Sequence, residues 1–332
     1  MLLARLMNRI WYRRNHPVSL LLAPFGWLYC LVMKGRRIAY QLRLRRSVRL
    51  DVPVVVVGNV VAGGTGKTPL VAWLAQFLKS NGFKPAIVCH GYGGIARDWP
   101  QQVRTDSDPI VVGDESVLLA RRSGCPVAAG RDRVATASAL LAHVECDVLI
   151  CDDGLQHLRL QRDLEIVVID GVRRHGNGRC LPAGPLREGL SRLASVDLVV
   201  ANDGAARGEY EMKLKTGPIT SLSDSSEHYT LDNLKGTAVH ALCGIGHPER
   251  FFKLLETNGA IVNRHTFPDH HVFTAADISF DADDLPVLMT EKDAIKCARF
   301  ASDRHWFIPV EANPHHLFAD RVLKLLKKRD HG

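Results

Sequence analysis

The chain has 332 residues, of which 46% are hydrophobic and 23% charged, so it has the composition of a globular protein and the length for two domains. Its net charge of +8 lies in the N-terminal segment, because residues 1–50 hold 11 Lys and Arg and no acid, which leaves a net charge of −3 for the rest. This distribution argues against a nucleic-acid partner and favours contact between the N-terminus and an anionic membrane surface.

A hydrophobic segment stands near the N-terminus. Residues 17–33 (PVSLLLAPFGWLYCLVM) are apolar, with basic residues on both sides. Seventeen residues are at the lower limit for crossing a bilayer, and Pro24 and Gly26 interrupt them. The flanking charges predict a membrane anchor or a shallow interfacial helix, with a buried core helix as the alternative. No cleavage pattern of a signal peptide follows, and residues 38–50 continue as a basic amphipathic stretch.

The next segment, residues 53–70 (PVVVVGNVVAGGTGKTPL), has the pattern of a phosphate-binding loop. A β-branched run over 53–57 is typical of a buried parallel strand, a glycine-rich loop follows, and residues 70–79 have apolar side chains at helical spacing. In such a loop, backbone N–H groups and a helix N-terminus bind phosphate oxygens. The residues expected to bind nucleotide are Gly63, Gly64, Thr65, Gly66, Lys67 and Thr68.

Two of these residues have specific expected roles. Lys67 would reach the β- and γ-phosphates, and the Thr68 hydroxyl would be a ligand of Mg²⁺. The pattern departs from G-x-x-x-x-G-K-[ST] at one position, because Val61 replaces the first glycine.

Strands and helices then alternate. Strands are expected over 84–89 and 127–129, and helices over 116–122 and 132–143, while residues 98–108 read as irregular. Asp114 and Glu115 precede the first of these helices, where acidic side chains are stabilised by the helix dipole, so capping is the plain interpretation of both.

A further strand, 147–151, ends in Asp152 and Asp153. Two carboxylates at the end of a strand beside a phosphate loop predict a Walker-B-like magnesium site. Strands over 164–170 and 197–202 follow. The loop between them contains Arg187 and Glu188, which are either a solvated pair or contacts to phosphate and magnesium.

This order predicts an α/β protein with a P-loop NTPase-like, doubly wound and mostly parallel sheet. Residues 204–235 are polar and lose the alternation, and a second set of strands and helices follows them. The expected organisation is an N-terminal hydrophobic and basic membrane-associated segment at 1–50, a nucleotide-binding core at 51–203, a linker at 204–235, and a smaller C-terminal α/β domain at 236–332 that closes over the cleft.

Taken together, the motifs resemble those of the tetraacyldisaccharide 4'-kinase family. The matching pieces occur in the family's order over nearly the whole chain. They are the short hydrophobic N-terminal segment, G-N-V-V-A-G-G-T-G-K-T-P (58–69), H-G-Y-G-G (90–94), G-D-E (113–115), D-D-G-L-Q-H (152–157), L-P-A-G-P-L-R-E (181–188), F-P-D-H-H (267–271) and T-E-K-D (290–293).

The resemblance implies ATP- and Mg²⁺-dependent phosphorylation of the 4'-hydroxyl of a tetraacyldisaccharide 1-phosphate, which makes lipid IVA in lipid A biosynthesis. It places the enzyme at the cytoplasmic face of the inner membrane of a Gram-negative bacterium. The partners expected are the glycolipid and the membrane surface, with no nucleic acid and no obligate protein partner.

The resemblance also suggests roles for single residues. An Asp–His pair as the general base maps to Asp114 and His270, with His271 as the rival to His270. Arg187 would stabilise charge on the transferred group. The magnesium ligands would be Thr68 with Asp152 and Asp153, and Glu188 is a further candidate. The family usually has Arg where this chain has His90, so a permanent positive charge is missing there.

Two other functional classes compete with a kinase. One is a membrane-associated nucleotide switch of the deviant-Walker type, an ATPase or GTPase. Such switches carry an additional Lys early in the loop, where this chain has Ala62, so the sequence disfavours this class. The other is a membrane scaffold that binds nucleotide only for stability, in which case the acidic residues and the Asp114/His270 pair would have no purpose.

Overall fold

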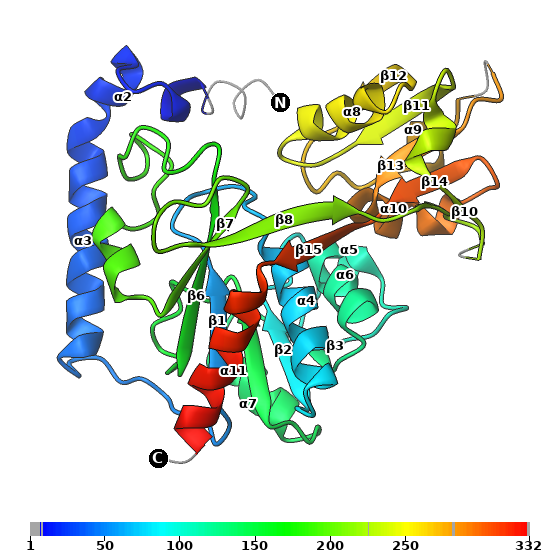
Figure 1. Ribbon diagram of the computed structural model, residues 1–332. Coiled ribbons are helices and arrows are strands. Elements are labelled where there is room, and N and C mark those ends of the chain that lie inside the picture. The colour runs from blue at the N-terminus through cyan, green and yellow to red at the C-terminus, as the bar shows by residue number, and fades with distance from the viewer. Residues whose placement is uncertain (1–6, 8, 225, 281–282, 331–332) are drawn as a thin grey trace.

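The computed structural model describes residues 7, 9–224, 226–280 and 283–330, and these form a mixed α/β molecule with two sheets (Figure 1). The helices are α2 (Pro17–Leu21), α3 (Ala23–Gln41), α4 (Lys67–Ser80), α5 (Pro109–Val112), α6 (Asp114–Ser123), α7 (Arg133–Leu141), α8 (Pro248–Thr257), α9 (Ala275–Ile278), α10 (Glu291–Cys297) and α11 (His316–Asp330), with 3-10 turns η1 (Leu190–Ser195), η2 (Leu231–Leu234) and η3 (Ala298–Phe300).

The larger sheet has the strand order β15-β8-β7-β6-β1-β5-β2-β4-β3. Its strands are β1 (Val54–Gly58), β2 (Pro85–Cys89), β3 (Gln101–Val103), β4 (Val127–Ala129), β5 (Val148–Asp152), β6 (Leu164–Asp170), β7 (Leu198–Asn202), β8 (Tyr210–Thr216) and β15 (Val310–Pro314). All neighbours pair in parallel except β3 with β4 and β15 with β8. The predicted mixed α/β class with a mostly parallel sheet is therefore confirmed.

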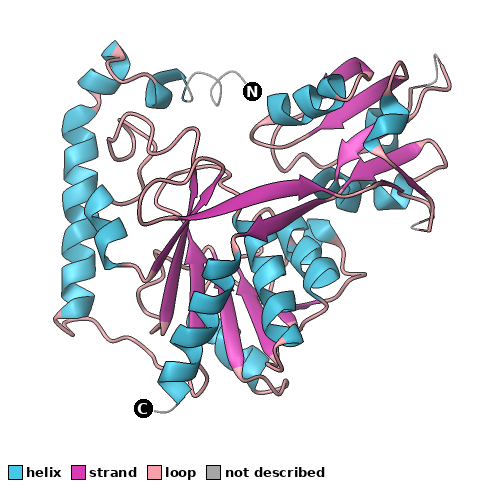
Figure 2. Ribbon diagram, in the orientation of Figure 1, coloured by secondary structure: helices cyan, strands magenta, loops and turns pink. Residues whose placement is uncertain are grey.

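Helices cover both faces of this sheet (Figure 2). In β1, Val55 and Val57 pack into the core under α4, α6 and α11, whereas Val54 and Val56 pack into the core under α7. A strand whose two faces are both buried explains why the sequence shows an unbroken valine run instead of alternation. The phosphate loop starts from this central strand.

The smaller sheet has the order β10-β9-β14-β13-β11-β12. Its strands are β9 (Ile219–Ser221), β10 (His228–Tyr229), β11 (Ala238–Cys243), β12 (Ile261–Thr266), β13 (Val287–Thr290) and β14 (His305–Ile308). After β14 the chain returns to the larger sheet through β15, which pairs with β8, so two neighbouring strands connect the two sheets (Figure 2).

Residues 204–235, predicted to be a linker from their polar composition and loss of alternation, contain β8, β9, β10 and η2. The polar composition of this segment is explained by the burial pattern of β8. Its side chains alternate between buried or half-buried and exposed positions, so charged residues such as Lys213 and Lys215 lie among the strand residues and hide the apolar pattern. Residues 98–108, expected to be irregular, likewise contain the short edge strand β3.

The N-terminal apolar segment forms α2 and most of α3, which lies along the outside of the larger sheet (Figure 1). Gly26 faces the core so closely that a Cβ there would lie 2.8 Å from the carbonyl oxygen of Cys180. The opposite side of the two helices is an exposed apolar surface, here called the α2–α3 stripe: Val18, Leu20, Leu21, Phe25, Trp27, Leu28, Leu31 and Val32.

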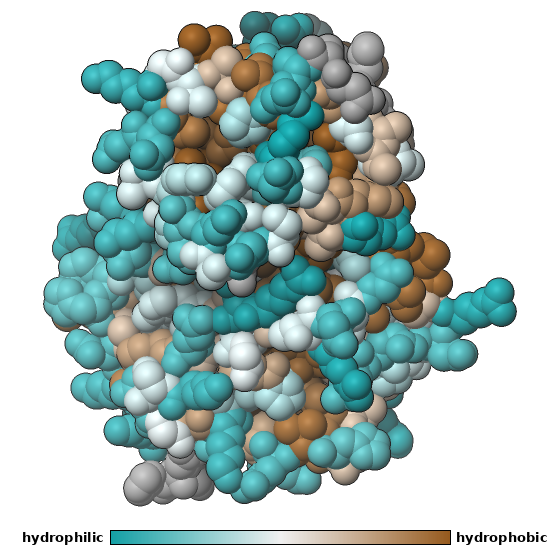
Figure 3. All heavy atoms as spheres, turned by 90° about the vertical axis from the view of Figure 1, so that its right-hand side faces the viewer, coloured by the Kyte–Doolittle hydropathy of each residue, from teal (hydrophilic) through white to brown (hydrophobic). Residues whose placement is uncertain are grey.

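No helix in the described part of the chain combines the length and the apolar character needed to cross a bilayer. The membrane-associated role of α3 therefore stays a prediction. The side of the molecule that lies on the right in Figure 1, away from α3, is largely hydrophilic with scattered hydrophobic patches (Figure 3).

Candidate active site

The phosphate loop connects β1 to α4 at the carboxyl edge of the larger sheet. Gly63 and Gly66 have φ angles of +105° and +94°, which are accessible to glycine and strained for other residues. Asn59 Nδ2 donates to the carbonyl of Gly63 (3.2 Å), and Asn202 Nδ2 donates to that of Thr65 (3.4 Å). The loop therefore leads directly into the N-terminus of α4, where backbone N–H groups can bind an anion.

Val61, at the position of the usual first glycine, has a structural role. It is buried and forms an antiparallel bridge with Leu186. The same pairing continues with Ala62 N–H donating to Pro185 (2.7 Å) and Arg187 N–H donating to Val60 (2.7 Å). The loop 181–188 is thereby fixed against the phosphate loop, which brings Arg187 beside it.

Asp152 and Asp153, at the end of β5, have opposite electrostatic environments. Asp153 lies 3.5 Å from Lys67 Nζ and 3.0 Å from Arg187 Nη1. Burial opposes its ionisation, but these two cations lower the pKa of Asp153 to about 2. Asp152 is only 4% exposed, and burial, followed by repulsion from Glu115 and Asp153, raises its pKa to about 7. Its Oδ1 has no hydrogen-bond partner among the described residues.

The other two predicted magnesium ligands have different neighbours. Glu188 accepts from Gln156 Nε2 (2.8 Å) and lies 3.5 Å from Arg192. Thr68, in the first turn of α4, lines a hollow between α4, α6 and β15. Within the residues that the structure describes, no three His, Cys, Asp or Glu side chains converge as a metal-binding group.

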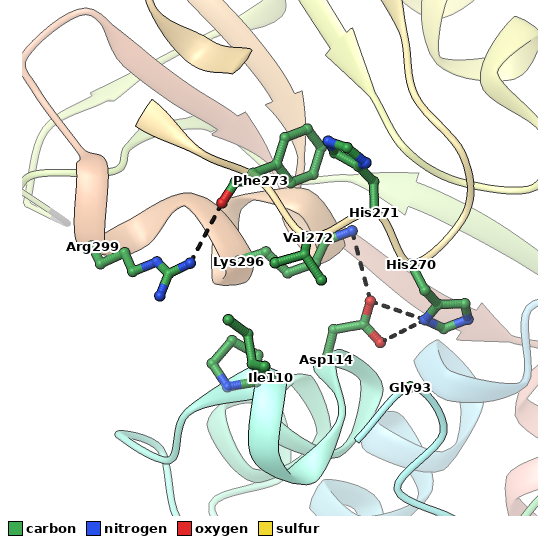
Figure 4. A pocket seen from close by; sticks show the side chains of 10 residues that line it. Gly93, Ile110, Asp114, His270, His271, Val272, Phe273, Lys296 and Arg299 are labelled. Atoms are coloured by element: carbon green, nitrogen blue, oxygen red, sulfur yellow. Dashed lines mark hydrogen bonds and ion pairs between the residues drawn. The ribbon is translucent and has the colours of Figure 1, made fainter. Parts of the chain in front are cut away.

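Asp114 and His270, 156 positions apart, are in direct contact. His270 Nδ1 lies 3.1 and 3.2 Å from the two carboxylate oxygens of Asp114. Asp114 is buried at the start of α6, and His270 comes from the loop after β12 with a left-handed φ of +59°. They line a hollow together with Gly93, Ile110, Val272 and Lys296, among others (Figure 4).

The adjacent histidine has a different orientation. His271 Nε2 lies 3.3 Å from Asp277, and its ring packs against Phe267 and Phe273. Between the two histidines, the structure brings only His270 to Asp114.

Two lysines of α10 lie beside Asp114 and His270. Lys292 Nζ is 3.4 Å from His270 Nε2, and Lys296 Nζ is 3.7 Å from Asp114 Oδ2. Burial raises the pKa of Asp114, but the hydrogen bond with His270 and the charges of Lys292 and Lys296 outweigh it, so the pKa of Asp114 is lowered. The pair therefore carries an anionic carboxylate at neutral pH.

A buried arginine connects the strand ends. Arg133 donates to the carbonyls of Cys89 (3.0 Å), Gly130 (2.7 Å) and Asp152 (3.1 Å). It also lies 3.4 Å from His90 Nδ1, and burial together with the Arg133 charge lowers the pKa of His90. His90 is therefore neutral, and the fixed cation at this place is Arg133.

Comparison with known proteins assigns the chain to a family. The model of one family, described as tetraacyldisaccharide-1-P 4'-kinase, matches residues 18–327. The chain belongs to the tetraacyldisaccharide-1-P 4'-kinase family. Two relatives named tetraacyldisaccharide 4'-kinase are those of Nitrosococcus oceani, 51% identical over 97% of this chain and 95% of the relative, and of Alkalilimnicola ehrlichii, 54% identical over 91% and 90%.

A crystal structure of the family has a similar fold. It is that of LpxK from Aquifex aeolicus in complex with ATP, with a TM-score of 0.78 and 26% identity over 93% of this chain and 99% of that one. The relatives come from Gram-negative bacteria, and the family resemblance found in the sequence is confirmed.

Several residues near the candidate site of this 4'-kinase family member were missed by sequence reasoning. Lys292 and Lys296 lie in and just after the T-E-K-D motif, and the sequence pattern by itself indicates no chemical role for either lysine. Arg133, in the first turn of α7, had no sequence signal beyond its place after a strand. Gln156 belongs to the motif D-D-G-L-Q-H. Its amide stands close in sequence to Asp152 and Asp153, and this closeness was the signal that could have indicated a role in the site.

Proposed function

We propose that this chain transfers the γ-phosphate of ATP to the 4'-hydroxyl of a tetraacyldisaccharide 1-phosphate, a step of lipid A biosynthesis. The observation that carries the proposal is the contact between Asp114 and His270, in a chain that has a phosphate loop and belongs to the 4'-kinase family. ATP as the donor is supported by the ATP-bound LpxK structure, which shares the fold over nearly the whole chain.

The phosphate loop would hold the triphosphate. Its backbone N–H groups and the N-terminus of α4 supply fixed partial charges, and Lys67 supplies a full one. In the structure Lys67 and Arg187 are both engaged by Asp153, so this carboxylate holds the two cations ready at the loop. Charge developing on the transferred phosphoryl group would be stabilised by Arg187, 3.0 Å from Asp153.

The donor set also fits Mg²⁺. A buried carboxylate oxygen of Asp152 has no hydrogen-bond partner among the described residues, and a divalent cation there would accept it as a ligand and favour the charged form of the carboxylate. Asp152, Asp153 and Thr68 would hold the ion, with Glu188 as a further ligand. Bound Mg²⁺ would neutralise charge on the phosphates.

Asp114 would act as the general base. As the sugar oxygen attacks the γ-phosphorus, its proton passes to the Asp114 carboxylate while the bond to the bridging oxygen of ADP breaks. His270 donates from Nδ1 to Asp114 and orients it. The first turn of α6 carries both Asp114 and Glu115, and the charge of Glu115 raises the pKa of Asp152.

The α2–α3 stripe would place the enzyme at the membrane surface. Its apolar side chains are exposed and basic residues lie at both ends of the segment, which suits an interfacial helix on anionic lipid. Since the acyl chains of the substrate stay in the bilayer, the active site must work at that surface. We place the enzyme at the cytoplasmic face of the inner membrane, where ATP is available.

The test is transfer of labelled γ-phosphate from ATP to a tetraacyldisaccharide 1-phosphate in detergent micelles, with wild type beside Lys67→Ala. We expect transfer by wild type and a loss of more than about 100-fold in the variant, because Lys67 contacts the transferred charge. ATP hydrolysis without transfer to the glycolipid would refute the kinase and support a nucleotide switch.

A further inference from the structure

The cation next to His270 is the feature that the proposed mechanism does not use. Lys292 Nζ lies 3.4 Å from Nε2 of His270, whereas the other ring nitrogen, Nδ1, contacts Asp114. Its position is fixed by Glu115 Oε1 at 2.9 Å and Asp269 Oδ1 at 3.2 Å. Lys292 therefore bridges α6, the loop after β12 and α10 at the catalytic pair.

The ammonium group of Lys292 determines which ring nitrogen of His270 carries the hydrogen. An ammonium group only donates hydrogen bonds, so a nitrogen that faces it must be the lone-pair nitrogen of the imidazole. Nδ1 then carries the hydrogen and donates to Asp114, 3.1 Å away. Burial would lower the pKa of Lys292, but the carboxylates of Glu115, Asp114 and Asp269 raise it, so this side chain stays protonated.

We propose that Lys292 is a positioning residue that holds His270 as the neutral Nδ1–H tautomer, so that His270 only donates to Asp114 and the carboxylate of Asp114 takes the sugar proton. This inference rests on the proposed kinase function. It gives the lysine of the T-E-K-D motif a role in the reaction.

The other charged groups around the pair act in different directions. Asp269 Oδ1, 3.8 Å from His270 Nε2, would favour a hydrogen on that nitrogen, and Lys292 lies closer to the same atom and compensates this charge. Lys296 acts on Asp114 and contacts Asp293 at 2.9 Å. The Tyr92 ring packs on His270 with centroids 4.7 Å apart and adds no charge.

The direct test is the tautomer of His270, read by long-range ¹H–¹⁵N NMR of the full-length protein in micelles. The His270 signals are assigned by their loss in His270→Gln. In wild type we expect a protonated Nδ1 and an unprotonated Nε2. In Lys292→Met and in Lys292→Gln, the second being a polar variant in case the first folds poorly, we expect hydrogen to appear on Nε2. A protonated Nε2 in wild type, or unchanged signals in both variants, would overturn the proposal.

The kinetic test is the pH profile of kcat/KM. Removing the charge of Lys292 raises the pKa of Asp114, so the acid limb should move to higher pH and kcat should fall by about 10- to 100-fold. Lys292→Arg keeps the charge and should keep the acid limb at its wild-type position. The proposal would be contradicted if the acid limb of the pH profile stayed at its wild-type position in both Lys292→Met and Lys292→Gln.

Arg122→Met is the matched control, because Arg122 connects the same two helices through Glu291 without contacting His270. It should leave both the tautomer and the acid limb unchanged. A shift of either in this control would show that the connection between α6 and α10, not Lys292, sets the tautomer. The NMR result does not depend on turnover, so failure of the kinase assay with the expected tautomer would reject only the proposed function.

Discussion

Asp152 and Asp153 are consecutive, yet their ionisation is opposite because their neighbours differ. Asp153 has the cations of Lys67 and Arg187, whereas Asp152 is buried against other acids. A carboxyl group with a raised pKa in the folded state holds its proton more tightly there than in the unfolded chain. Without a cation, the stability contributed by Asp152 is therefore lost as pH rises from about 4 to about 7.

Asp152→Asn should relieve this penalty. In metal-free buffer above pH 7 we expect the variant to be more stable than wild type by on the order of 1–4 kcal/mol, with little difference near pH 4. Mg²⁺ with ATP should stabilise wild type and have little effect on the variant. Thermal unfolding at several pH values, with and without Mg²⁺, measures both effects, and equal stabilisation of the two proteins by Mg²⁺ would remove Asp152 from the metal site.

Asp114→Asn tests the general base. The substitution keeps the shape of the side chain and removes the proton acceptor, so kcat should fall by about 10²- to 10⁴-fold while the dissociation constant of ATP changes little. The control is His271→Gln, because His271 faces Asp277 and not Asp114. Kinetics and ATP binding compare the two, and a loss of kcat in His271→Gln as large as that in Asp114→Asn would contradict the choice of His270 over His271 as the partner of Asp114.

At the scale of elements, α3 has two sides with different tasks. One side is fitted to the core at Gly26, where a Cβ would clash with the Cys180 carbonyl, and the other carries the α2–α3 stripe. Helices that lie on a membrane combine such an apolar side with basic flanks.

The double substitution Leu28→Glu with Leu31→Glu should reduce binding to anionic vesicles by about tenfold or more, because each leucine loses apolar contact with lipid. Both side chains are exposed, so the thermal stability should change by less than about 0.5 kcal/mol. Ile261→Glu, at a 61% exposed position on β12, is the control and should bind vesicles like wild type. Vesicle sedimentation measures the effect, and unchanged binding of the double variant would contradict an interfacial role for α3.

The elements with strong local patterns were predictable from the sequence. The strand, glycine loop and helix over 53–80 have the predicted order, because periodicity and glycine positions are local properties. The strand β8 was not predictable, since its apolar side is interrupted by charges and its partner β15 is far away in the chain. The contact of Asp114 with His270 spans 156 positions, so only the family resemblance suggested it.

For the molecule as a whole, the candidate site depends on how the two sheets are held together. Asp114 belongs to the part built on the larger sheet and His270 to the part built on the smaller one. Besides the contact between Asp114 and His270, Arg122 of α6 forms a bidentate ion pair with Glu291 of α10 at 2.6 and 2.9 Å. It also forms a single contact with Glu311 of β15 at 3.0 Å. The pair with Glu291 keeps α6 against α10, in addition to the direct contact of Asp114 with His270.

The Arg122–Glu291 pair can be tested by a double-mutant cycle on kcat. Arg122→Met should lower kcat about three- to tenfold, because a looser contact between α6 and α10 orients Asp114 less precisely toward the substrate while its contact with His270 remains. Glu291→Gln should have a similar but smaller effect, since Arg122 retains Glu311. The two residues touch, so the double variant should lose little more than Arg122→Met alone, with a coupling of up to about 1 kcal/mol, which corresponds to the loss in Glu291→Gln. Losses that simply multiply would show that the two residues act separately, and the two sheets would then be held together by Lys292 with Glu115 and by the strands β8 and β15.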